Sequence, residues 1–142
     1  MALARFAQKV FSDKTIGLLK RYYAQQKGIH LAFVFGSIAT GSLRTDSDVD
    51  VAVLFETVPD PFELSLLAGE LSSLIGREVD LVALNEASPI LKMQVLRFGK
   101  LLYQSEPRRF HEFYVRTVNE YDDLKQMRKK AEQSILLGRI HA

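Results

Sequence analysis

Three short apolar segments, separated by other patterns along the chain, constrain the fold of this sequence more than any other feature. Their boundaries and sequences are 30–35 (HLAFVF), 49–55 (VDVAVLF) and 78–84 (EVDLVAL). Segments of this length, rich in Val, Phe and Leu, are typical of buried strands. Helical periodicity covers 62–75 and 88–98, and a fourth, shorter strand is expected at 100–103. We therefore predict an α/β (α+β) fold, a mixed sheet of about four strands flanked by helices, with the strand order left open.

Helical patterns also lie outside this core. One covers roughly 2–26, with Ser12 as a candidate cap and Gly28 as the stop. The last one starts at Pro107 and carries an apolar stripe at steps of three or four: Phe110, Phe113, Tyr114, Val118, Tyr121, Leu124, Met127, Ala131 and Ile135. A helix of that length would be about 45 Å long and would overhang a small domain. Two outcomes stay open: it protrudes and buries its stripe on another subunit, or it folds back as two helices broken near Asn119.

The composition favours one domain over residues 1–142, with a core at about 30–104 and a helical segment at 107–138. The chain has 142 residues, of which 47% are hydrophobic, enough for a core without staples. The absence of cysteine excludes disulfides, thiolate zinc sites and cysteine nucleophiles, and fits a cytoplasmic protein. We expect neither a signal peptide nor a membrane span. A net charge of +2 does not argue for direct nucleic-acid binding.

Two aspartates at the start of the second predicted strand are the first candidate site residues. Asp48 and Asp50 are two positions apart, so on a strand they point to the same face, while Val49 points to the other. Two carboxylates on one face repel each other, and a strand does not need them for stability. A divalent cation is the simplest remedy, and oxygen ligands favour Mg²⁺ or Mn²⁺ over zinc.

Two further features extend this site. Asp80 interrupts the third apolar strand, and it would join the same face if that strand lies beside the second. Three carboxylates could then hold two ions about 4 Å apart. Gly36 and Ser37 follow the first strand, where glycine permits a sharp turn and a hydroxyl can bind phosphate. Each residue alone has an ordinary explanation as a turn, a cap or an exposed strand position, but all of them together point to bound nucleoside triphosphate.

The pattern Gly-Ser, ten residues, Asp-x-Asp, with a later Asp on a strand, resembles the polymerase-β nucleotidyltransferase superfamily, and the short chain looks like its minimal nucleotidyltransferases (MNT). The resemblance covers about 31–84, and the run 96–104 (LRFGKLLYQ) also resembles the end of the family's core. It implies that the three aspartates ligate two Mg²⁺ ions and that Asp80 also acts as, or helps to position, the base.

The same resemblance assigns the remaining site residues. Gly36 and Ser37 would hold the β- and γ-phosphates of ATP, and Ser47 would touch the triphosphate or its metal. Many relatives carry a basic residue soon after the Gly-Ser pair, where this chain has Thr40. Arg44 is the nearest replacement, and Lys92 or Arg97 could help from another element.

MNT proteins commonly act as antitoxins beside a HEPN-domain ribonuclease toxin, so the resemblance implies transfer of AMP from ATP to a tyrosine of such a partner. Two alternatives remain: a non-catalytic antitoxin that masks its partner by binding, and a nucleotidyltransferase for a small hydroxyl compound. The second alternative would require a substrate-binding domain, and the sequence predicts none beside the catalytic core. The basic run 128–130 is read as a solvated helix face.

Overall fold

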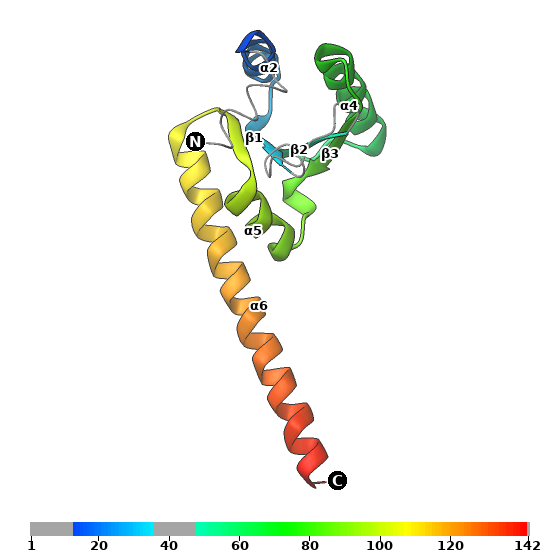
Figure 1. Cartoon of the computed structure of the whole chain (residues 1–142). Helices are drawn as coiled ribbons and strands as arrows, with labels where there is room; N and C mark the ends of the chain where they lie inside the picture. Colours follow the sequence, from blue (N-terminus) through cyan, green and yellow to red (C-terminus); the bar gives the residue numbers. More distant parts are fainter. Residues whose placement is uncertain (1–12, 36–47, 142) are drawn as a thin grey trace.

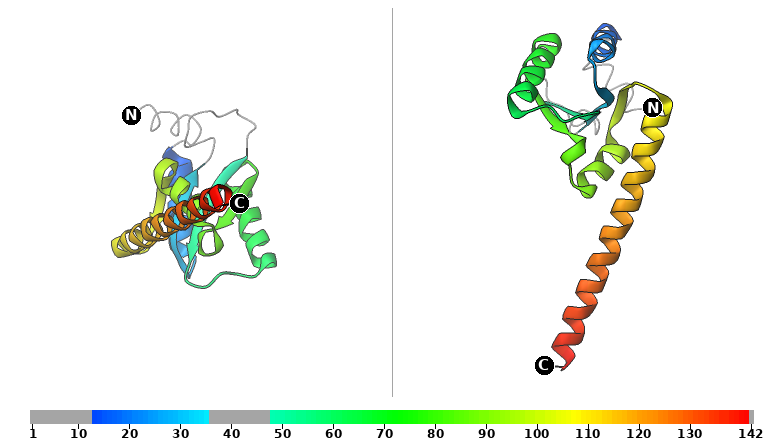
Figure 2. Two further views of the ribbon diagram at one scale, coloured as in Figure 1. Left: turned by 90° about the horizontal axis from the view of Figure 1, so that it is seen from below. Right: turned by 180° about the vertical axis from the view of Figure 1, so that it is seen from behind.

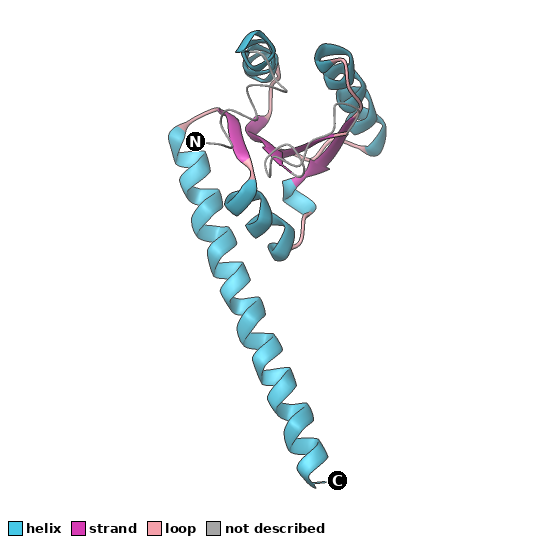
Figure 3. Cartoon of the chain, viewed as in Figure 1, coloured by secondary structure: helices cyan, strands magenta, loops and turns pink. Residues whose placement is uncertain are grey.

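The computed structural model describes residues 13–35 and 48–141. In chain order the elements are α2 (Asp13–Gln25), β1 (Ile29–Phe35), β2 (Val49–Phe55), α4 (Pro61–Ile75), β3 (Val79–Ala83), the short 3-10 helix η1 (Leu84–Glu86), α5 (Pro89–Phe98), β4 (Lys100–Gln104) and α6 (Pro107–His141). Figure 1 shows a small sheet with helices on both faces and α6 extending away from it, and Figure 3 separates the helices from the strands in the same view. The predicted α/β class and the four strands are confirmed.

The sheet is mixed, in the order β3-β2-β1-β4. The central strand β1 is antiparallel to both β2 and β4, whereas β2 and β3 are parallel. Two neighbouring parallel strands require a crossover connection, and α4 supplies it. The registers place Phe35 opposite Asp50 and Asp50 opposite Asp80. The last residue of β1 and the first residues of β2 and β3 therefore lie at the same end of the sheet.

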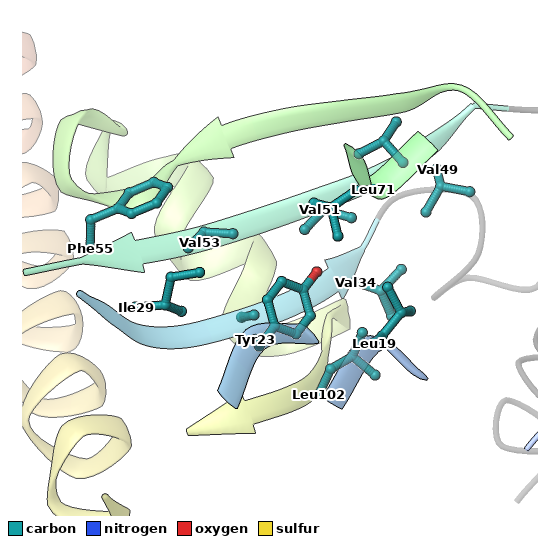
Figure 4. Close-up of a cluster of buried hydrophobic side chains, with 12 residues drawn as sticks. Leu19, Tyr23, Ile29, Val34, Val49, Val51, Val53, Phe55, Leu71 and Leu102 are labelled. Atoms are coloured by element: carbon teal, nitrogen blue, oxygen red, sulfur yellow. The ribbon is translucent and has the colours of Figure 1, made fainter. Parts of the chain in front are cut away.

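One face of the sheet is buried under α2 and α4. Alternate residues of β2 point to this face because successive side chains on a strand alternate. Figure 4 shows them with the side chains that cover them from the helices and from β4: Val49, Val51, Val53, Phe55, Leu19, Tyr23, Leu71 and Leu102. Full burial of a side chain of this kind stabilises the fold by about 1.5–3 kcal/mol. This cluster fixes which face of β2 is left for the polar residues.

The opposite face is covered by η1, α5 and α6. Its buried residues come from five elements: Leu31, Phe33, Ala52, Leu84, Val95 and Phe113. Ala52 belongs to this face, and Asp48 and Asp50 have the same parity along β2. The carboxylates thus lie on the α5 side of the sheet, beyond the end of its apolar cluster.

Caps define the ends of the central helices. Asp60 accepts a hydrogen bond from the Glu63 N–H (2.8 Å) at the start of α4, and Ser88 accepts one from the Leu91 N–H (3.2 Å) at the start of α5. Gly76 ends α4 in the left-handed conformation, with φ at 77°. The candidate cap Ser12 lies outside the described residues.

The long helix α6 is continuous through Asn119, so the predicted alternative of a break there is wrong. Its first half buries Phe113 and Thr117, whereas Tyr114, which belongs to the predicted stripe, is 49% exposed. Every side chain from Lys125 to Gly138 is exposed. The right-hand view of Figure 2 shows this second half extending clear of the other elements, which confirms the predicted overhang. Of the helices in the described part of the chain, none is long and apolar enough to cross a membrane.

Candidate active site

The position of Asp80 is set by the connection between α4 and β3. The Ser72 hydroxyl donates to the Ala68 carbonyl oxygen (2.8 Å) and accepts from the Val79 N–H (3.0 Å). In this way a side chain near the end of α4 satisfies the first backbone donor of β3. Val79, 7% exposed, inserts into the core beside it. Asp80 follows directly and must point to the opposite face.

The start of β2 is fixed by the same junction. The Val49 N–H donates to the Glu78 carbonyl oxygen (2.9 Å), and the Val49 side chain is completely buried. One buried valine in each strand therefore aligns the two strands at the point where the acidic residues begin. Ser72 was not singled out in the sequence, because a serine near a helix end has many ordinary uses.

The three aspartates lie at one end of the sheet, where Asp50 and Asp80 share a face because the third strand is next to the second. Asp50 and Asp80 are register partners on adjacent strands, and Asp48 lies two residues before Asp50. Asp50 is partly buried, while Asp48 and Asp80 are exposed. Desolvation raises the pKa of Asp50, and the negative charges of Asp80 and Asp48 raise it further. The Asp50 carboxyl therefore lies within electrostatic reach of both other carboxylates.

The three carboxylates do not form a closed metal-binding group in this structure. Across residues 13–35 and 48–141, no three His, Cys, Asp or Glu side chains are gathered closely enough to form a ready metal-binding group. The four other predicted site residues, Gly36, Ser37, Arg44 and Ser47, lie outside the described residues. What the structure does place is the strand that leads into the Gly-Ser pair, since Phe35 at the end of β1 lies opposite Asp50.

The two basic residues expected to help from another element are engaged with α6. Lys92 Nζ forms an ion pair with Glu120 (3.1 Å), and this lysine side chain is only 13% exposed. The Arg97 guanidinium lies over the Tyr121 ring, 5.7 Å from its centroid. Both contacts join α5 to α6, so in this structure Lys92 and Arg97 stabilise the packing of the two helices.

Topology and acidic face together are those of a nucleotidyl-transferring core: a mixed sheet with helices on both faces, carboxylates on adjacent parallel strands, and a neighbouring strand, β1, that Gly36 and Ser37 follow in the sequence. The sequence model described as "Polymerase beta, Nucleotidyltransferase" matches residues 18–108. The chain belongs to this family.

Several more specific similarities point to one branch of the family. The protein adenylyltransferase MntA of Shewanella oneidensis is 33% identical over 122 residues, which cover 86% of this chain and 85% of that protein. A solved structure described as a toxin–antitoxin with AMP-PNP is similar with a TM-score of 0.72 and 30% identity, covering 89% of this chain and 99% of that chain. A second, of the tri-AMPylated Shewanella oneidensis HEPN toxin in complex with MNT antitoxin, gives a TM-score of 0.71 and 26% identity with the same coverage.

Proposed function

We propose that this chain is an antitoxin that transfers AMP from ATP to a hydroxyl group, most directly that of a tyrosine, on a partner HEPN ribonuclease toxin. The single observation that carries the chemistry is the parallel register that sets Asp50 opposite Asp80, with Asp48 on the same face. The similar proteins support the donor and the partner: MntA is a protein adenylyltransferase, and the structural neighbours include an AMP-PNP complex and an AMPylated HEPN toxin. An ATP-dependent reaction of this kind belongs in the cytoplasm.

A divalent cation, Mg²⁺ or Mn²⁺, fits the donor set of this face. Three carboxylates supply only oxygen ligands, which suit these hard ions. The raised pKa of Asp50 shows that its ionised form is disfavoured by burial and by its two acidic neighbours. A bound cation would reverse that balance by attracting all three charges. When bound, two such ions would neutralise charge on the triphosphate and align it for in-line displacement.

The chain's own residues would hold the ions, orient the acceptor and bind the phosphates. Asp48 and Asp50 would hold the ions, while Asp80 would complete the site and orient the acceptor hydroxyl or take up its proton. Gly36 and Ser37, with Arg44 and Ser47, would hold the phosphates. The acceptor oxygen forms a bond to the α-phosphorus, the bond to the bridging oxygen breaks, and pyrophosphate leaves. Positioning and charge neutralisation supply most of the rate enhancement.

The test is transfer of label from α-labelled ATP to the purified cognate HEPN protein in the presence of Mg²⁺. We expect the HEPN protein to gain AMP and to lose ribonuclease activity, and Asp48→Asn with Asp50→Asn to abolish both effects. The matched control is Glu56→Gln with Glu86→Gln, which removes two exposed carboxylates elsewhere and should leave transfer unchanged. Ribonuclease inhibition without labelling would overturn the proposal in favour of masking. Labelling of a small hydroxyl compound alone would overturn it in favour of a different acceptor.

A further inference from the structure

The apolar side chains in the second half of α6 are not buried against any other described part of the chain. Its large apolar residues have exposed fractions of 67% for Met127, 58% for Ile135, 57% for Leu136 and 56% for Leu137. A helical segment of this length is only marginally stable in water without tertiary contacts. An overhang that is helical and apolar at its end is therefore a surface for another molecule.

The pattern at the end of the overhang indicates what kind of surface would cover it. Ile135, Leu136 and Leu137 are consecutive, and consecutive helical residues point about 100° apart. Together they span about 200° of the helix circumference, which is wider than the stripe of roughly 100° by which a helix packs against one neighbour. One helix lying alongside would cover one side only. This tip (Ile135–Leu137) fits a pocket formed by several elements, such as the groove of a helical bundle.

Charge distinguishes a different protein from a second copy of this chain. The basic run (Arg128–Lys130) lies on the overhang, between one and two turns before the tip, and all its side chains are exposed. Two copies packed in parallel along the overhang would bring their basic runs close together, which is unfavourable, and an antiparallel copy is the single neighbouring helix that covers one side only. A partner with acidic residues around an apolar pocket would satisfy both features. We propose that the tip of α6 inserts into an apolar, acid-rimmed pocket of the HEPN toxin and so holds the toxin for modification.

This proposal rests on the proposed function and adds a docking site outside the acidic face. A docking site raises the effective concentration of the acceptor without altering the chemistry. Its loss should therefore raise the KM for the toxin while leaving kcat at saturating toxin, and the affinity for ATP, unchanged. Loss of a carboxylate at the acidic face should instead lower kcat.

The experiment compares two double variants in the AMP-transfer assay. Leu136→Ser with Leu137→Ser removes the large apolar side chains of the tip without adding charge, and Gln126→Ser with Gln133→Ser makes the same replacement at polar, exposed positions of the overhang. We expect the tip variant to raise the KM for the toxin roughly 10-fold or more, as the loss of central interface residues does, and the control to change it less than about 3-fold. Both variants should unfold at the wild-type temperature because none of the four side chains is buried.

Other outcomes separate this inference from the proposed function. Wild-type protein that transfers no AMP to the toxin would overturn the proposed function itself. A tip variant with wild-type KM, beside a wild-type protein that does transfer AMP, would overturn the docking proposal alone. Light scattering of the chain by itself should give a monomer, and a dimer that the tip substitutions dissolve would assign the tip to a second copy instead. Arg128→Glu with Lys130→Glu should weaken toxin binding and reduce its dependence on salt.

Discussion

Gly99→Ala is the sharpest test of how the end of β1 is held, because the space for a side chain at this position is already occupied. A Cβ on Gly99 would lie 2.4 Å from the Val95 carbonyl oxygen and 3.3 Å from that of Val34. The first distance is about 0.9 Å shorter than an ordinary carbon–oxygen contact of ~3.3 Å. Both oxygens belong to the backbone, so the last turn of α5 or the start of β4 must shift. The shift would be transmitted to β1 two residues before Gly36.

Forced overpacking of this kind costs about 1–3 kcal/mol, and the rigidity of the two backbone oxygens places Gly99→Ala at the upper end. At roughly 4 °C per kcal/mol for a chain of this size, the unfolding temperature should fall by about 8–12 °C. Denaturant unfolding followed by circular dichroism measures the free energy directly. The AMP-transfer assay, run well below the new unfolding temperature, then reports whether the displaced strand also slows transfer.

Gly69→Ala is the matched control, since it adds the same methyl group to an exposed position inside α4. Nothing lies within 4 Å of a Cβ on Gly69, apart from the backbone of its own helix. Replacing glycine by alanine in a helix interior should stabilise the protein by about 0.5–1 kcal/mol. The two substitutions must therefore have opposite signs. A Gly99→Ala protein as stable as wild type would refute the account of the packing between α5 and β1.

Three further substitutions test the cores and the acidic face. Tyr23→Phe should stabilise the protein by about 1 kcal/mol in urea unfolding, because the Tyr23 hydroxyl is buried and has no hydrogen-bond partner in the described structure. Phe113→Ala should cost about 3–5 kcal/mol, whereas Phe62→Ala, at a position 72% exposed, should cost far less. Asp50→Asn should raise the unfolding temperature of metal-free protein at neutral pH. Since burial and two acidic neighbours raise the pKa of Asp50, the wild type loses stability as pH rises through that pKa, and the difference between the proteins should vanish at acidic pH, where the carboxyl is protonated.

Much of the fold could be predicted because local chemistry specifies it. The second strand was predicted at 49–55, where it is observed, since valines and a phenylalanine alternate there with other residues. Pro61 and Gly76 bound α4 because each has a conformational preference that suits a helix end. The order in which strands pair in a sheet is not specified by any such local preference. No local pattern in the sequence makes β2 and β3 parallel neighbours. Asp80 could therefore be placed beside Asp50 only on the condition that these two strands are adjacent.

The long C-terminal helix shows the same limit. Its apolar stripe predicted the helix and its inward contact at Phe113, but the stripe also included Tyr114, which is exposed. Thr117 was missed because a threonine does not extend an apolar pattern, although it is buried against the sheet. Which part of a long amphipathic helix meets its own core depends on how far the core extends. That distance is a property of the whole fold.

All three carboxylates belong to a single strand–helix–strand crossover, from Asp48 through α4 to Asp80. The three carboxylates of the proposed ion site thus come from one contiguous stretch of the sequence, and β1 leads into the residues proposed to hold the phosphates. The helix that reaches outward lies later in the chain and contributes no carboxylate to that face. Exchanging the exposed second half of α6, from Lys125 onward, would leave both cores and the acidic face in place, so under this proposal the choice of target and the chemistry can diverge independently.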